Sequence, residues 1–221
     1  MAGVLALVGG SEWREGCTFD RGLLAAAGTD EVLVLPTAAA FEGPDKAVEH
    51  ARSWFGQLGA RVEPLWVLHR AEATDPAAAD VVRGSRFIYL SGGSPLHLRS
   101  VLKDSPLWDA LVHAWNDGSV IAGSSAGAMV IGDPMVDPRG GAFTVGLGLI
   151  TQLAVIPHFD QWSHDKIHRA IELADPGIAV VGIDEQTALI RDPDGGWRAE
   201  GAGEVTVHVD GRVVNLAHLP S

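Results

Sequence analysis

Short apolar runs that alternate with amphipathic stretches constrain the fold of this chain more than any other feature. The runs cover residues 4–8, 31–35, 61–68, 86–90, 120–122, 153–157 and 178–183. Between several of them lie segments with apolar residues at helical spacing, such as 45–58 and 105–115. Strands that alternate with helices predict βαβ units, and therefore a doubly wound α/β fold with a mostly parallel sheet.

The pattern changes near the C-terminus. Turn sequences at 192–195 and 210–211 separate shorter runs, and residues 205–209 alternate between apolar and polar. These features predict antiparallel hairpins added to the edge of the parallel sheet. No repeat, low-complexity segment or internal linker interrupts the chain, so we expect residues 1–221 to form a single domain.

Composition narrows the class of protein. Hydrophobic residues make up 47% of the 221 residues and charged residues 20%, as in ordinary globular proteins. The net charge of −12 argues against a nucleic-acid partner, because phosphates require a basic face. No run reaches transmembrane length, and no basic segment precedes residues 4–8. We therefore expect a first strand rather than a signal peptide, no membrane association and a cytoplasmic location.

One stretch carries the strongest chemical signal. The apolar run 120–122 leads into Gly123-Ser124-Ser125-Ala126-Gly127, which has the Gly-x-Ser-x-Gly pattern of a nucleophile elbow. Glycine at both flanking positions lets the backbone turn sharply and approach itself closely. A helix that begins here directs free N–H groups toward the serine, which favours a developing negative charge. The pattern predicts that Ser125 is a nucleophile.

A serine nucleophile needs a base and a group that orients the base. Of nine histidines, His158 is the best candidate, because it follows the end of the run 153–157, where α/β sheets place ligands; His97 is an alternative. Glu185 follows the run 178–183 in the same way and is the predicted acid. The carboxylates that rival it are Asp133, Asp137 and Asp160.

An oxyanion hole needs two N–H donors directed at one point. Ala126 follows the serine and supplies one, while the pair Gly92-Gly93 after the run 86–90 is the predicted source of the other. Histidine, cysteine and carboxylates show no metal-ligand spacing, so we expect no metal. Gly9-Gly10 lacks the full dinucleotide-binding pattern, so we expect no nucleotide cofactor either. The single cysteine, Cys17, forms no disulfide within the chain and is more simply a small apolar residue than a nucleophile.

Taken in order along the chain, these stretches resemble the serine peptidases that include dipeptidase E (aspartyl dipeptidase) and cyanophycinase. The matching stretches are 90–93, 123–128, 146–149, 157–159 and 182–189. The resemblance implies a class I glutamine-amidotransferase-like fold of the flavodoxin-like type, with Ser125 as nucleophile and His158 as base. The cyanophycinase-like branch implies Glu185 as the acid, whereas the dipeptidase-like branch implies an aspartate between serine and histidine, such as Asp137.

The chain departs from the cyanophycinase-like pattern around the substrate. Ile156-Pro157 precedes His158 where those proteins carry Asp-Gln, and Trp162, His164 and Ile167 occupy their arginine positions. We therefore expect a small peptide as substrate rather than an arginine-rich polymer, with an aspartyl group suggested by the resemblance. The predicted substrate-binding residues are Ser94, Arg99 and Trp162, and the cations that could meet a carboxylate are Arg14, Arg99, Lys103, Lys166 and Arg169.

The resulting hypothesis is a serine hydrolase that cleaves an amide bond through an acyl-enzyme on Ser125. An esterase of the α/β-hydrolase type shares the elbow, but its acid precedes its histidine, as Asp137 would. A non-catalytic binding protein on the same scaffold is the alternative from another functional class.

Overall fold

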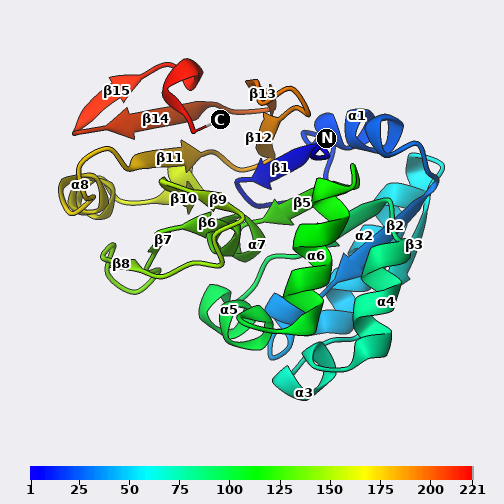
Figure 1. The fold of residues 1–221 in the computed structure, drawn as a ribbon. Helices are drawn as coiled ribbons and strands as arrows, with labels where there is room; N and C mark the ends of the chain where they lie inside the picture. The colour runs from blue at the N-terminus through cyan, green and yellow to red at the C-terminus, as the bar shows by residue number, and fades with distance from the viewer. Residues whose placement is uncertain (221) are drawn as a thin grey trace.

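A seven-stranded sheet forms the centre of the computed structural model, which describes residues 1–220 (Figure 1). The strand order is β13-β12-β1-β5-β4-β2-β3. Five adjacent strands run parallel: β1 (Leu5–Val8), β5 (Val120–Ser124), β4 (Phe87–Leu90), β2 (Glu31–Leu35) and β3 (Arg61–Pro64). Because the strands are parallel, their carboxyl ends share one edge: Val8 pairs with Ser124, and Leu90 with Gly123.

Helices cover both faces of this sheet, as the alternating pattern predicts. On one face, α1 (Phe19–Ala27) and α2 (Pro44–Gln57) pack onto inward side chains such as Phe87 and Tyr89. On the other face, Ile88 and Leu90 contact a cluster formed with α4 (Pro76–Gly84), α5 (Pro95–Leu102) and α6 (Pro106–Asn116). Strand β4 thus divides its side chains between two cores, because successive residues of a strand point to opposite faces.

The starts of these helices follow local sequence signals. Asp75, Ser94 and Ser105 each accept a hydrogen bond from an N–H of the first turn, and each is followed by proline. Figure 1 shows α4 and α6 side by side in front of the sheet, with the short helix α3 (Arg70–Ala73) at the bottom of the view. The short helix η1 (Thr37–Ala39) contacts α5. Helix α1 contains Gly22 and was not among the predicted helices.

A second sheet holds the strands that the sequence pattern assigned to a single sheet. Its order is β15-β14-β11-β10-β6-β9, and it lies at the upper left of Figure 1. Helix α7 (Ala126–Ile131) contacts both β5 of the first sheet and β10 of the second, and all of its residues are buried. The strands are β6 (Gly132–Asp133), β9 (Ile150–Thr151), β10 (Leu153–Pro157), β11 (Ala179–Ile183), β14 (Val205–Val209) and β15 (Arg212–Val214).

The C-terminal hairpins form, but they extend two sheets rather than one. Strands β12 (Thr187–Arg191) and β13 (Trp197–Gly201) add antiparallel to β1, whereas β14 and β15 add antiparallel to β11. The chain thus crosses from the second sheet back to the first between Ile183 and Thr187. This crossing brings the acid predicted for the site to the edge where β1 and β5 end.

The remaining elements are short. A two-stranded ribbon joins β7 (Met135–Val136) to β8 (Phe143–Thr144). The turn η2 (Phe159–Gln161) and helix α8 (His164–Glu172) follow β10, and η3 (Leu216–His218) lies near the C-terminus. Over residues 1–220, none of the helices combines the length and the apolar character that crossing a bilayer requires.

Candidate functional site

Ser125 occupies a sharp turn between β5 and α7. Its φ of 48° and ψ of −104° are rarely adopted by a residue with a side chain. The flanking glycines explain how the turn forms. A Cβ added to Gly123 would lie 2.6 Å from the carbonyl carbon of Gly127, and one added to Gly127 would lie 2.5 Å from the Leu90 carbonyl oxygen. Only glycine at both positions permits this approach of strand to helix.

His158 follows β10 and reaches Ser125 from the second sheet. Its backbone is left-handed, with φ 49° and ψ 41°, and its N–H donates to the Gly9 carbonyl at 2.7 Å. The imidazole Nε2 lies 3.0 Å from Ser125 Oγ. The β1–α1 connection therefore fixes the backbone of the histidine against the first sheet.

Glu185 completes the series of hydrogen bonds. Its Oε1 lies 2.7 Å from His158 Nδ1. Because a carboxylate only accepts hydrogen bonds, Nδ1 carries the ring proton and Nε2 accepts from the Ser125 hydroxyl. The His158 and Glu185 side chains are 33% and 29% exposed, so the series lies at an accessible surface. The structure thus brings together the three side chains that the sequence singled out.

The three rival carboxylates make other contacts. Asp137 pairs with Arg139 at 2.6 Å, and hydrogen bonds from Arg139 lower the Asp137 pKa to about 2. Asp133 accepts the Gly146 N–H at 2.8 Å. Asp160 Oδ1 accepts the backbone N–H of Glu185 at 3.0 Å. Asp160 therefore does not contact the imidazole; it holds the backbone of Glu185, whose side chain does.

Asp160 is suited to that contact by its charge. Partial burial raises its pKa, but hydrogen bonds from Gln161 and from the Glu185 N–H outweigh burial, and the net pKa is lowered. The ionised carboxylate is the stronger acceptor for the Glu185 N–H.

The glycine pair after β4 shows an arrangement that the sequence did not indicate. The Gly92 N–H donates to Glu12 Oε1 at 2.9 Å, and the Ser124 hydroxyl donates to Glu12 Oε2 at 2.8 Å. Among residues 1–220, neither the Gly93 N–H nor the Ala126 N–H has a hydrogen-bond acceptor. Of the three predicted oxyanion donors, Gly92 is thus engaged by a carboxylate, whereas Gly93 and Ala126 are available.

The predicted substrate-binding residues lie in different surroundings. Ser94 Oγ accepts the His97 N–H at 3.3 Å and caps α5, so its hydroxyl has a structural partner. Arg99 is half-buried in α5, and its Nε is shielded from solvent with no acceptor within the described part of the chain. Trp162 is half-buried below the Lys166 ammonium, which lies 5.8 Å from the ring centroid.

The other candidate groups are accounted for by local contacts. His97 Nε2 lies 2.8 Å from the Leu68 carbonyl oxygen, whereas the histidine that contacts the Ser125 hydroxyl is His158. Lys103 pairs with Asp104, while Arg14 and Arg169 are exposed. Burial raises the Cys17 pKa to about 11, so the thiol stays protonated and is a poor nucleophile at neutral pH.

Two functional contributions of the β1–α1 loop were missed by the sequence analysis. Gly9-Gly10 accepts the His158 and Gln186 N–H groups at 2.7 and 2.8 Å, and therefore joins the two sheets beside the site. Glu12 contacts both the elbow strand and the glycine pair. The available signal was position alone: this loop follows the carboxyl end of β1, as the other site residues follow their strands.

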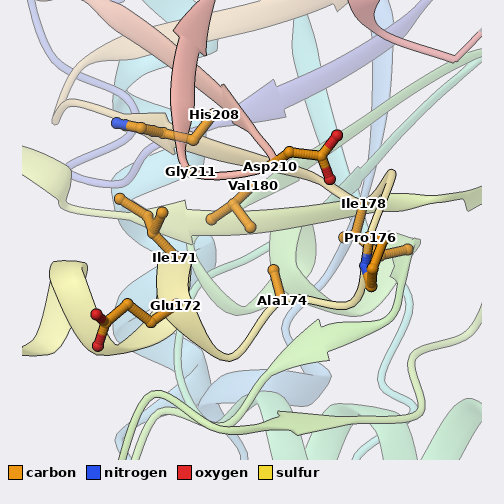
Figure 2. A pocket seen from close by; sticks show the side chains of 9 residues that line it. All are labelled: Ile171, Glu172, Ala174, Pro176, Ile178, Val180, His208, Asp210 and Gly211. Atoms are coloured by element: carbon orange, nitrogen blue, oxygen red, sulfur yellow. The ribbon is translucent and has the colours of Figure 1, made fainter.

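A cavity of about 320 Å³ lies elsewhere, between α8, β11 and β14 (Figure 2). Figure 2 shows Ile171 and Val180 facing one another across it, with His208 and Asp210 at the strand end. None of Ser125, His158 and Glu185 lines it. Within residues 1–220, no group of three or more His, Cys, Asp or Glu side chains is placed to hold a metal ion.

Comparison with known proteins shows which protein family this chain resembles in sequence and structure. The sequence model of peptidase family S51 matches residues 5–196. A cyanophycinase of Synechococcus elongatus is 33% identical over 211 residues, which cover 88% of this chain and 64% of the relative. A cyanophycinase of Geminocystis herdmanii is 29% identical and is covered to 74%. The chain therefore spans less than two-thirds of the length of the first of these curated relatives and about three-quarters of the second.

Solved structures agree with the family match. A peptidase from an acI-B1 actinobacterium superposes with a TM-score of 0.84 at 29% identity, over 97% of each chain. A putative peptidase E protein from Listeria monocytogenes superposes with a TM-score of 0.66 at 18% identity, over 95% of this chain, which establishes a shared fold. The predicted α/β fold class is confirmed by both the topology and these neighbours.

Proposed function

Because the chain belongs to peptidase family S51, we propose that it is a serine peptidase that hydrolyses an amide bond in a small peptide. The observation that carries this proposal is the hydrogen-bonded series from Ser125 through His158 to Glu185, with Nε2 3.0 Å from Oγ and Nδ1 2.7 Å from Oε1. Nucleophile, base and orienting acid at these separations form the arrangement that activates a serine hydroxyl.

The reaction follows from that geometry. Ser125 Oγ attacks the scissile carbonyl while its proton passes to His158 Nε2, and the Glu185 carboxylate stabilises the imidazolium. The tetrahedral intermediate collapses as Nε2 returns the proton to the leaving amine, which leaves an ester on Ser125. A water molecule then gives its proton to Nε2 and attacks the ester, and the acid product leaves as Ser125 regains its proton.

The intermediate's negative oxygen requires aimed donors. The N–H groups of Gly93 and Ala126 support such a role, because neither has an acceptor among residues 1–220. Ala126 directly follows Ser125, and Gly93 directly follows Gly92. A Cβ on Gly92 would lie 3.5 Å from the Ser125 Cβ, so the glycine pair is adjacent to the nucleophile. Gly92 itself is committed to Glu12.

Substrate class is the next part of the proposal. An aspartyl side chain needs a cation. The described ion pairs give Arg99, Arg14, Lys166 and Arg169 no carboxylate partner, but Arg99 alone of these four is half-buried, and its Nε is shielded with no acceptor in the described part of the chain. Arg99 lies in α5, the helix that begins directly after Gly93 and Ser94. Cyanophycin, the substrate that the relatives' names indicate, is disfavoured because Trp162, His164 and Ile167 are not arginines. We place the reaction in the cytoplasm, with no cofactor.

Active-site labelling tests this function. A fluorophosphonate should label the wild-type protein and leave Ser125→Ala unlabelled, because only an activated serine attacks phosphorus. A panel of α-aspartyl dipeptides, isoaspartyl dipeptides, neutral dipeptides and cyanophycin then identifies the substrate. Absence of labelling would favour a binding protein, activity confined to neutral esters would favour an esterase, and efficient cyanophycin cleavage would overturn the assignment of substrate.

A further inference from the structure

The loop between β1 and α1 carries a carboxylate that joins three strand ends beside the nucleophile. Glu12 comes from the loop after β1, accepts the Gly92 N–H after β4 at 2.9 Å, and accepts the Ser124 hydroxyl at the end of β5 at 2.8 Å. Ser124 is fully buried and directly precedes Ser125. A single side chain therefore sets the separation between the elbow and the glycine pair.

The residues on either side of Glu12 have a strained backbone. Ser11 and Trp13 have φ values of 49° and 62°, in the left-handed region that residues with side chains rarely adopt. Trp13 is only 3% exposed, and its ring packs 5.2 Å from that of Tyr89 and 5.9 Å from that of His50. Such strain persists where surrounding packing determines it, and it concentrates at functional sites. Packing of Trp13 therefore fixes the direction of Glu12.

The hydrogen bonds of the glycine segment show what Glu12 controls. The Gly92 N–H donates to Glu12, and the Ser94 N–H donates to the Ala38 carbonyl at 2.8 Å. Gly93 lies between them with φ 135°, so close to Ala38 that a Cβ would be 2.3 Å from its carbonyl oxygen. Both neighbouring N–H groups are thus tied to protein acceptors, and the orientation of the Gly93 N–H is set by these two anchors.

We infer that Glu12 is a positioning residue that orients the Gly92-Gly93 backbone so that the Gly93 N–H stabilises the reaction's oxyanion. This inference rests on the proposed peptidase function. A carboxylate can accept both hydrogen bonds at once, which alanine cannot. Glutamine can accept from Gly92 and donate to the Ser124 hydroxyl, because a hydroxyl also accepts. The conservative variant Glu12→Gln should therefore keep the geometry that Glu12→Ala loses.

The kinetic test compares these variants on one peptide substrate. Loss of one oxyanion donor costs about 100- to 1,000-fold in kcat, so we expect Glu12→Ala to lower kcat by at least about tenfold with KM changed little. Glu12→Gln should restore most of the activity. Glu15→Ala is the matched control, because Glu15 is an exposed carboxylate of the same loop. The pH profile should be unchanged in all variants, since His158 and Glu185 are intact.

A second measurement does not depend on activity. Amide hydrogen exchange by NMR should show a slowly exchanging Gly92 N–H in the wild type and faster exchange in Glu12→Ala, with thermal denaturation to verify folding. Wild-type kcat in Glu12→Ala, a change in KM alone, a Glu12→Gln variant as impaired as Glu12→Ala, or unchanged Gly92 exchange would each overturn the inference. Failure of the proposed function is distinguishable, because the wild-type protein would then resist fluorophosphonate labelling.

Discussion

The backbone of Gly10 lies against the imidazole of His158. A Cβ built on Gly10 would be 2.2 Å from Cε1 and 2.5 Å from Nε2 of that ring. Gly10 also has φ 117°, a conformation that other residues rarely adopt. The ring that contacts Ser125 therefore occupies space that any side chain at position 10 would need.

Replacing Gly10 by alanine should displace the histidine. Because a shift of about 1 Å in a catalytic group can cost about 100-fold in rate, we expect Gly10→Ala to lower kcat by about that factor and to lower Tm. Gly22→Ala is the control, since nothing lies within 4 Å of a Cβ added there in α1. The free energy of unfolding of Gly22→Ala should rise by about 0.5–1 kcal/mol, because alanine favours a helix more than glycine does. Wild-type kcat in Gly10→Ala would contradict the packing described.

Sequence reasoning located the hydrogen-bonded series because its members obey a positional rule. Ser125, His158 and Glu185 each follow the carboxyl end of an apolar run, where open α/β folds place their ligands, and this rule holds although β5 belongs to the first sheet and β10 and β11 to the second. Strand existence was also predictable, since a buried run carries its own signal. The division into two sheets was not, because periodicity identifies strands without naming their partners.

Glu12 illustrates what local pattern omits. Its partners, Gly92 and Ser124, lie 80 and 112 residues away, so the contacts depend on the completed sheet. Gly92 and Gly93 were equivalent as sequence, yet tertiary contact engages one N–H and leaves the other. Local sequence pattern therefore identified the residues of the site, but it could not predict how the backbone N–H groups of Gly92 and Gly93 are oriented.

Ser125 should separate activity from stability. Ser125→Ala should lower turnover by several orders of magnitude, because the nucleophile is lost. Ser125→Gly should be equally inactive but more stable than Ser125→Ala, by about 1 kcal/mol, because φ 48° and ψ −104° strain any residue with a Cβ. Urea denaturation of both variants measures the difference. Equal stability would show that the turn carries little strain.

Glu185 should govern the rate through the imidazole. Glu185→Gln keeps a similar shape but loses the charge that stabilises the imidazolium, so kcat should fall by about 100- to 10,000-fold with KM nearly unchanged. Asp137→Asn is the control, because Asp137 pairs with Arg139 and not with the ring. If Asp137→Asn removed activity while Glu185→Gln retained it, the identity of the acid would be wrong.

Asp160 should have a smaller effect in the same direction. Its carboxylate holds the Glu185 backbone N–H at 3.0 Å, and the hydrogen bonds it accepts lower its pKa despite partial burial. Asp160→Ala releases that N–H, so we expect kcat to fall by about tenfold, whereas Asp160→Asn keeps an acceptor oxygen and should lose less. Steady-state kinetics at neutral pH measures both. An unchanged kcat in Asp160→Ala would show that Glu185 is positioned without this contact.

Asp20 should make the protein's stability depend on pH. It is fully buried in α1, and burial raises its pKa to about 7, although a hydrogen bond from Trp54 Nε1 at 2.8 Å opposes the shift. Its Oδ1 has no partner within residues 1–220. In an unfolded chain the same carboxyl ionises near pH 3.9, about the usual value. Folding therefore retains a proton that the unfolded chain releases between these two values.

The free energy of unfolding should consequently fall as pH rises from about 4 to about 7, and should stay low above that range once both states are ionised. Asp20→Asn stays neutral and keeps an oxygen that accepts the Trp54 N–H, so it should lack this dependence. At pH 8 we expect the free energy of unfolding of Asp20→Asn to exceed that of the wild type by a few kcal/mol, on the order of 1.4 kcal/mol for each unit of pKa shift. Near pH 4 the two proteins should differ little. Urea denaturation from pH 4 to 8.5 measures this, with the exposed Asp30→Asn as control. Parallel pH profiles for wild type and Asp20→Asn would show that the Asp20 carboxyl ionises at its ordinary pH in the folded protein.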